Sequence, residues 1–218
     1  MSPARNAPAE PGASAYVSRG GAKLEHALHA FSIDPVGRRA LDAGASTGGF
    51  TDCLLQRGAA RVIAVDVAYG ELAWTIRNDE RVRVVERTNV RTLDLPSLGE
   101  DPVDLVVADL AFISLKTVRD ALLGAAAAGA DLLLLVKPQF EASRANIERG
   151  GVVRDPHVWT ETLRSVASAY REAGCGLIGA TASPLVGPAG NREFFLHLRR
   201  GGTDAGDEPI HEAVRQAP

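Results

Sequence analysis

The sequence predicts an α/β fold in which a mostly parallel sheet carries helices on both faces. Three features support this prediction. Short apolar runs alternate along the chain with segments of helical periodicity, most of these runs are continuously apolar, and a glycine-rich turn joins the first two. Continuous apolar runs are typical of strands that are buried on both faces. The expected strands are residues 39–43, 61–66, 82–85, 103–108, 132–136, 177–182 and 194–199.

Helices are expected between these strands. Residues 21–31 place their apolar side chains on one helical face. Residues 49–57 form a second expected helix that ends before Gly58, because glycine readily adopts the left-handed conformation common after a helix. Asp155 and Pro156 are typical of a helix start, as an N-cap and a first-turn proline. The helix that they begin carries one apolar stripe, formed by Trp159, Leu163, Val166 and Tyr170.

The length of 218 residues fits one domain with a substantial core. Residues 1–15 and 201–218 are rich in small and polar residues, so we expect both segments to be disordered and residues 16–200 to form the domain. The formal net charge is -3, and the acidic segment 201–218 accounts for all of it. The expected domain is therefore neutral, whereas nucleic-acid-binding domains usually carry a basic surface.

Composition excludes several classes of protein. Cys53 and Cys175 share no motif and have no histidines at metal-ligand spacing, so reduced thiols and no metal site are expected. The N-terminus has no apolar leader segment. The longest apolar stretch, residues 121–136, is interrupted by Asp131 and is too short to span a bilayer. We therefore expect a cytoplasmic protein that does not contact membranes.

The glycine-rich turn predicts nucleoside binding. The first expected strand runs into this turn, and the second ends on Asp66, whose carboxylate could accept hydrogen bonds from ribose hydroxyls. Dinucleotide-binding turns usually have a middle glycine that makes room for a pyrophosphate, and here Ser46 takes that place. The turn thus favours S-adenosylmethionine (SAM) over NAD. The residues expected to contact the cofactor here are Gly44, Ser46, Thr47, Gly48, Gly49 and Phe50.

Ionisable residues directly follow two further strands. Asp109 follows residues 103–108 and Lys137 follows residues 132–136, at the strand ends where open α/β sheets bind ligands. A buried ion costs on the order of several kcal/mol unless it is paired. Glu193 would join the same edge if the last strand is antiparallel. A structural ion pair is the alternative for each residue alone, but the set favours a catalytic site.

Lysine usage sharpens this interpretation. The chain contains three lysines and 21 arginines. Arginine keeps its proton in proteins, whereas a buried lysine can act as a base. Lys137 is therefore a candidate base. Without further information, Lys23 would be interpreted as a solvated charge on the first helix.

Seven blocks of the sequence together resemble the TlyA (haemolysin A) family of FtsJ-like ribose methyltransferases. These blocks are residues 16–25 (YVSRGGAKLE), 41–55 (LDAGASTGGFTDCLL), 86–89 (ERTN), 109–115 (DLAFISL), 137–141 (KPQFE), 150–155 (GGVVRD) and 190–194 (GNREF). The resemblance covers residues 16–200 nearly without gaps. It implies a Rossmann-like class I SAM methyltransferase fold, with a seven-stranded, mostly parallel sheet whose last strand is antiparallel.

The resemblance also implies 2′-O-methylation of cytidine in ribosomal RNA by a Lys-Asp-Lys-Glu set. This set falls on Lys23, Asp109, Lys137 and Glu193. Asn89, at the end of the third expected strand, is then expected near the adenine of SAM. Family members usually begin with a small S4-type RNA-binding domain, and only fifteen residues precede the matching region here. The resemblance therefore leaves open whether a partner supplies RNA binding.

These observations lead to one mechanistic hypothesis and two candidate acceptors. Lys137 removes the proton of the acceptor hydroxyl, Lys23 stabilises the developing alkoxide, and Asp109 and Glu193 orient the two amines. The expected acceptor is rRNA or a ribosomal subunit. A hydroxylated small molecule is the alternative, favoured by the missing S4 domain and the neutral core. A binding-only or pore-forming role is disfavoured, because all four residues are present and no stretch could span a membrane.

Overall fold

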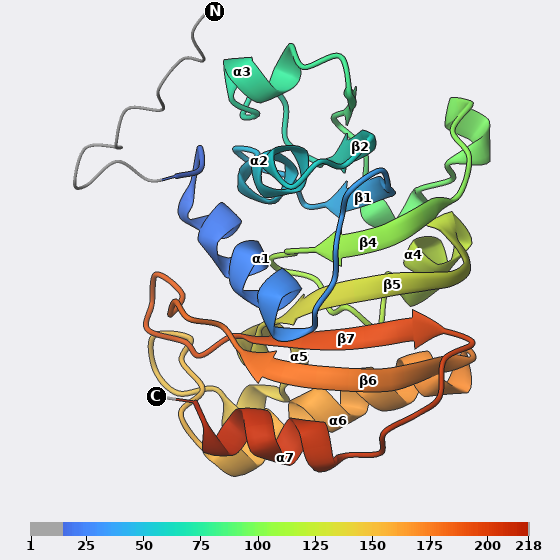
Figure 1. The fold of residues 1–218 in the computed structure, drawn as a ribbon. Coiled ribbons are helices and arrows are strands. Elements are labelled where there is room, and N and C mark those ends of the chain that lie inside the picture. The colour runs from blue at the N-terminus through green and yellow to red at the C-terminus, as the bar shows by residue number, and fades with distance from the viewer. Residues whose placement is uncertain (1–14, 218) are drawn as a thin grey trace, which may run out of the picture.

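A computed structural model of the chain describes residues 15–217 and shows helices on both faces of a central sheet (Figure 1). The seven strands lie in the order β3-β2-β1-β4-β5-β7-β6. The first five pair in parallel, and β7 is antiparallel to both of its neighbours. The expected seven-stranded sheet with an antiparallel last strand is therefore confirmed. The strands are β1 (Arg39–Ala43), β2 (Arg61–Val65), β3 (Val82–Val85), β4 (Val103–Ala108), β5 (Ala126–Val136), β6 (Cys175–Ala182) and β7 (Phe194–Arg200).

The described chain also contains seven α-helices and three 3₁₀ turns. The helices are α1 (Arg19–Ala30), α2 (Gly49–Gln56), α3 (Trp74–Arg77), α4 (Arg119–Ala125), α5 (Pro138–Glu141), α6 (Pro156–Glu172) and α7 (Glu208–Arg215). The 3₁₀ turns are η1 (Val90–Thr92), η2 (Pro96–Leu98) and η3 (Arg144–Asn146). Between residues 15 and 217, no helix is both long and apolar enough to cross a membrane.

Strand β4 shows how the sheet builds two cores. Leu105 and Val107 pack with α1, α2 and α3 on one face, whereas Val106 and Ala108 pack with α4, α6 and α7 on the other. Successive side chains of a strand point to opposite faces, and all four are fully buried. Burial on both faces explains why the central strands appear in the sequence as continuous apolar runs.

The predicted helix boundaries at residues 58 and 155 are confirmed by local geometry. Asp155 accepts a hydrogen bond from the His157 N–H and caps α6. Gly58 follows α2 with a φ of +84°, a conformation that glycine adopts without a steric cost. The apolar stripe of α6, from Trp159 to Tyr170, is buried as expected.

Strand β5 is longer than expected, since it begins at Ala126 rather than at residue 132. Its first residues are alanines and a glycine, which have low strand propensity and therefore give no strand signal in the sequence. The extension pairs with β4 through Val103 and Ala126, after an irregularity in the register. Tertiary pairing, rather than local preference, thus makes this segment a strand.

The C-terminal segment corrects another expectation. Residues 201–217 are ordered, and α7 buries Ile210 and Ala213 against the core. Arg171 of α6 donates hydrogen bonds to Asp204 and Asp207. The prediction of a disordered acidic tail is therefore wrong for this described part, because its acids pair with arginines and α7 packs against the core. The domain continues past residue 200, whereas the disorder expected for residues 1–14 lies outside the described residues.

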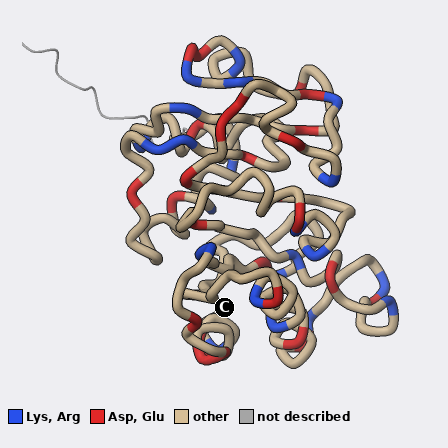
Figure 2. The backbone as a smooth tube through the Cα atoms, turned by 90° about the vertical axis from the view of Figure 1, so that its right-hand side faces the viewer, with Lys and Arg blue, Asp and Glu red and all other residues tan. Residues whose placement is uncertain are grey.

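Charges of both signs are interspersed along the chain (Figure 2). Many of them are paired, as with Arg171 and its two acids in the C-terminal segment. This arrangement agrees with the neutral net charge calculated for residues 16–200.

Candidate active site

Four ionisable residues flank strands at one edge of the sheet. Asp66 directly follows β2, Asp109 follows β4, Lys137 follows β5, and Glu193 directly precedes β7. Because β7 is antiparallel, its first residue lies at the edge where the parallel strands end. This is the edge at which open α/β sheets bind their ligands.

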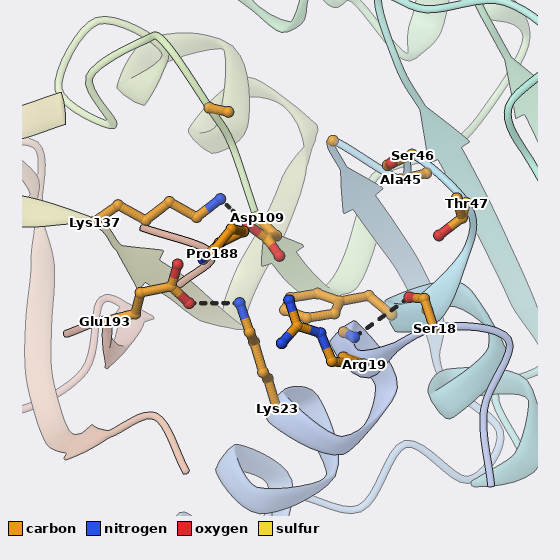
Figure 3. A pocket seen from close by; sticks show the side chains of 15 residues that line it. Ser18, Arg19, Lys23, Ala45, Ser46, Thr47, Asp109, Lys137, Pro188 and Glu193 are labelled. Atoms are coloured by element: carbon orange, nitrogen blue, oxygen red, sulfur yellow. Dashed lines mark hydrogen bonds and ion pairs between the residues drawn. The ribbon is translucent and has the colours of Figure 1, made fainter. Parts of the chain in front are cut away.

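The four residues of the expected Lys-Asp-Lys-Glu set line one cavity of about 380 Å³ (Figure 3). Lys137 Nζ lies 2.5 Å from Asp109 Oδ1, and Lys23 Nζ lies 2.5 Å from Glu193 Oε2. The side chains are 14% and 19% exposed in the first pair, and 12% and 3% exposed in the second. Each amine is thus held by one acid and still reaches the cavity.

The position of Lys23 follows from the way α1 is anchored. The Ser18 side chain caps the helix by accepting a hydrogen bond from the Gly20 N–H. The N–H of Val17 donates to Asp52 of α2, which ties the start of α1 to the neighbouring helix. From this position Lys23 points across the cavity to Glu193 (Figure 3). Lys23 is therefore not the solvated charge that the sequence alone suggests, and its catalytic role remains what the resemblance implies.

The glycine-rich turn brings distant parts of the chain into close contact. A Cβ atom on Gly44 would lie 2.5 Å from the carbonyl oxygen of Asp109, and one on Gly49 would lie 2.2 Å from Ser18 Oγ. Gly44 also has a φ of +88°. Side chains at these two positions would therefore separate the end of β1 from the end of β4, and α2 from α1. The turn thus shapes the protein around the cavity as well as leaving room for a ligand.

Asp66 is held at the end of β2 by two backbone donors. The Ser46 N–H donates to Asp66 Oδ2 at 2.7 Å, and the Ala68 N–H donates to Oδ1 at 2.8 Å. An ionised carboxylate has about four lone-pair positions, so both oxygens can accept further hydrogen bonds. The carboxylate is therefore oriented and still able to accept hydrogen bonds from two neighbouring hydroxyls.

A second cavity, of about 640 Å³, continues from the first. Gly44, Ser46 and Asp109 line both cavities, and the second also contacts Asp66 and Asn89. Together the two form one trough along the carboxyl ends of β1, β2 and β4. A nucleoside joined to an amino acid, as in SAM, has the extended form and the polar groups that such a trough can hold. The residues present thus fit this cofactor.

Most of the expected cofactor residues line this trough, with one exception. Thr47, Gly49 and Phe50 line the first cavity, but Gly48 lines neither of the two. Gly48 is the N-cap of α2 with a φ of +98°, and a Cβ there would contact Leu72 at 2.9 Å. The contact between Gly48 and the cofactor stays a prediction, because Gly48 lies next to Gly49 of the first cavity without lining it. Gly48 allows the sharp turn into α2.

A buried acid beneath the turn was not expected. Asp42 of β1 is fully buried, and Thr51 Oγ1 donates a hydrogen bond to its Oδ2 at 2.6 Å. Burial raises the pKa of Asp42 to about 7, and the nearby charges of Asp109 and Asp66 add to this effect. The sequence signal was an acid inside an otherwise apolar strand.

Glu141 does not follow a strand and was not expected among the residues near the cavity. This residue closes α5, and its carboxylate accepts hydrogen bonds from Ser114 Oγ at 2.6 Å and from the Leu115 N–H at 2.7 Å. The KPQFE block contained it, but no spacing rule connects residue 141 to residues 114 and 115. Only the tertiary structure brings them together.

The fold and the trough together define a class I SAM-dependent methyltransferase. The solved SAM-dependent methyltransferase from Mesorhizobium loti shares this fold, with a TM-score of 0.59 and 17% identity over 82% of this chain and 98% of that one. A model of the FtsJ-like methyltransferases matches residues 16–200. The chain belongs to this FtsJ-like family and, within it, to the TlyA group.

Two similar proteins support membership of that group. The TlyA protein of Mycobacterium tuberculosis, a 16S/23S rRNA (cytidine-2′-O)-methyltransferase, is 53% identical over 94% of this chain and 78% of its own. The solved structure of a hemolysin-like protein from Streptococcus thermophilus has a TM-score of 0.90 and 38% identity, and covers 95% of this chain and 76% of its own. The resemblance inferred from the sequence blocks is therefore confirmed.

Proposed function

We propose that this chain methylates the 2′-hydroxyl of cytidine in ribosomal RNA. The observation that carries the proposal is the convergence of two lysine–acid pairs in a cavity that joins the nucleoside trough. The 53%-identical relative is named for this activity. Among the described residues, no contact in the cavity favours a small-molecule acceptor. Such an enzyme would act in the cytoplasm, where ribosomes are found.

The catalytic roles follow from the two pairs. When bound, SAM supplies an electrophilic methyl group, so the protein must align an acceptor oxygen and remove its proton. Lys137 takes the proton of the ribose hydroxyl, whose oxygen would receive the methyl group as the methyl–sulfur bond of SAM breaks and leaves its electron pair on sulfur. Asp109 holds the Lys137 amine and stabilises the ammonium that this transfer creates. A positioned base contributes about 10²–10⁴-fold to a rate, and correct alignment can supply roughly 7–11 kcal/mol.

Lys23 acts as the fixed positive charge of the site. Its pairing with the buried Glu193 keeps the ammonium at the wall of the cavity. There it stabilises the negative charge that develops on the acceptor oxygen. In this proposal Lys137 removes the proton, and Lys23 stabilises the negative charge.

The trough residues provide the cofactor site in this proposal. Gly44, Ser46 and the residues of the first cavity hold the methionine part of SAM. Asp66 accepts hydrogen bonds from the ribose hydroxyls. Asn89 already uses its Oδ1 to accept from the Arg91 N–H, so its NH₂ group is the donor that can reach the adenine.

The test is transfer of a tritiated methyl group from SAM to four acceptors measured side by side. These are small ribosomal subunits, large ribosomal subunits, free rRNA, and a metabolite extract. We expect incorporation into a subunit or into rRNA, located at a cytidine 2′-oxygen by nuclease digestion. Incorporation into the metabolite extract alone would overturn the rRNA proposal.

A further inference from the structure

We propose that Glu141 is a positioning residue that sets the geometry of the Lys137–Asp109 pair. This inference rests on the proposed function, because it assigns that pair to the reaction. Glu141 joins two loops that carry the pair: the loop after β4, which begins at Asp109, and the short helix α5, which follows Lys137. Its two carboxylate oxygens accept one hydrogen bond each from Ser114 and Leu115 of the first loop.

These contacts close a ring of interactions. The chain runs from Asp109 to Ser114, crosses to Glu141 through the hydrogen bond, returns along α5 to Lys137, and closes through the 2.5 Å ion pair with Asp109. The two arms of the ring are short, with six residues from 109 to 114 and five from 137 to 141. A shift of one loop relative to the other must therefore change the position of the Lys137 amine relative to Asp109.

The loop after β4 needs such an anchor. Phe112, between Asp109 and Ser114, has a φ of +64°, which is unfavourable for a bulky residue. Its side chain is 91% exposed, so burial does not impose this conformation. The Phe112 ring instead contacts the ring of Phe140 of α5, with 5.2 Å between centroids. The surrounding contacts must hold a strained loop in place, and Glu141 supplies two hydrogen bonds to the second and third residues after Phe112.

The loop segment that Glu141 holds is also hydrogen-bonded to the buried core of the domain. Leu115 donates its N–H to Glu141 and accepts a hydrogen bond at its carbonyl oxygen from the Tyr170 hydroxyl, at 3.1 Å. Tyr170 is fully buried in α6. Both backbone groups of Leu115 are thus held, so Glu141 positions the loop against a rigid part of the domain.

Burying the Glu141 carboxylate costs free energy, and its hydrogen bonds offset this cost. Burial raises the pKa of Glu141, whereas the bonds from Ser114 and Leu115 and the charge of Lys116 oppose that rise. In this geometry each carboxylate oxygen accepts one of the two bonds. Glutamine has only one acceptor oxygen, but its NH₂ group can donate to the Ser114 hydroxyl. We therefore expect Glu141→Gln to keep much of the anchor and Glu141→Ala to lose it.

The experiment compares kcat and KM for the RNA acceptor at saturating SAM in Glu141→Ala, Glu141→Gln and the wild type. We expect kcat of Glu141→Ala to fall about 10- to 100-fold, because small misplacements of reacting groups cost up to that much. The acceptor KM should change little, and Glu141→Gln should lie between the wild type and the alanine variant. Glu100→Gln is the matched control, since Glu100 is a buried acid outside the site that accepts from Arg39 and Arg61. Its kcat should equal that of the wild type.

A second background separates positioning from a general loss of folded protein. If Glu141 acts through Lys137, Glu141→Ala should cause no further loss of rate in a Lys137→Ala enzyme. An equal fractional loss in both backgrounds, or a wild-type kcat for Glu141→Ala, would overturn this proposal while leaving the function intact. A wild-type rate for Lys137→Ala would instead overturn the catalytic assignment, and the role of Glu141 with it.

Discussion

The sheet has one edge formed by the carboxyl ends of its parallel strands and an opposite edge formed by their amino ends. These two edges hold their acids in different ways. At the carboxyl edge, Asp109 and Glu193 each pair with a single lysine. Toward the opposite edge, Asp131 accepts hydrogen bonds from Arg38, His197 and Arg199, each at 2.8 Å. There, Glu100 likewise accepts from Arg39 and Arg61. One edge is thus built with lysine and the other with arginine and histidine.

This difference distinguishes the acids proposed to serve the reaction from the acids that hold the strands together. Arginine keeps its charge and offers several donors in a fixed plane, so it suits an acid that ties strands together. Lysine has a single flexible amine that can give up a proton. An acid with one lysine partner leaves that amine available to a substrate. The chain retains lysine at the edge where we propose that a proton is transferred, although it uses arginine almost everywhere else.

The largest expected effect comes from replacing the lysine that is proposed as the base. Lys137→Ala should lower kcat by about 10²–10⁴-fold, the usual contribution of a positioned base. Lys137→Arg should be nearly as inactive, because the guanidinium keeps the charge but not the ability to accept a proton. Methyl transfer and SAM binding should be measured in parallel. A Lys137→Arg enzyme with a wild-type rate would show that charge alone suffices at this edge.

The next effect concerns stability at the arginine edge. Asp131→Asn should destabilise the fold by about 3 kcal/mol, the lower end for a broken buried pair, since Arg38 and Arg199 remain partly exposed to water. Chemical denaturation at neutral pH measures this loss. At temperatures well below unfolding, kcat should be unchanged. A large fall in kcat with intact stability would erase the distinction between the edges.

The lowered pKa of Asp131 makes the stability of the fold depend on pH. Burial alone would raise the pKa of Asp131, but hydrogen bonds from His197, Arg199 and Arg38 outweigh burial and lower that pKa. Its stabilising contribution is therefore complete above the unfolded value of about 4 and is lost as the pH falls toward the lower folded value. Stability of the wild type should decline in acid more steeply than that of Asp131→Asn. Parallel acid denaturation curves would contradict this assignment.

The smallest effect is expected from Asp42, whose hydrogen-bond partner is the Thr51 hydroxyl rather than a cation. Its folded pKa of about 7 lies above the unfolded value, so its contribution is complete below about pH 4 and is lost as the pH rises through 7. Asp42→Asn should remove this decline, whereas Asp94→Asn, at an exposed position, should not. Unfolding free energies at several pH values between 4 and 8 measure the difference. An unchanged decline in Asp42→Asn would contradict the raised pKa.

Local signals predicted most of the fold because the central strands are buried on both faces. Their apolar runs predicted the exact bounds of β1 and β4. A glycine predicted the end of α2, and an aspartate predicted the start of α6. The start of β5 and the helix α7 could not be predicted in this way. Alanines of β5 become a strand only by pairing with β4, and the acids before α7 become ordered only by pairing with arginines of α6.

The site residues also differ in whether a local sequence signal identifies them. Asp109 and Lys137 were predictable because they directly follow buried strands, and Glu193 because the antiparallel direction of β7 was considered. Lys23 and Glu141 lie on helices, and their partners are distant in the chain. No periodicity carries that information. The family resemblance supplied Lys23, and the three-dimensional structure supplied Glu141.

The place of β7 has a consequence for how the enzyme is made. This strand is inserted between β5 and β6, both of which are synthesised before it, and Glu193 enters with it. A chain still emerging during translation therefore lacks the acid that holds Lys23 until nearly all of the sheet has been synthesised. The same late segment of the chain therefore completes both the sheet and the Lys23–Glu193 pair.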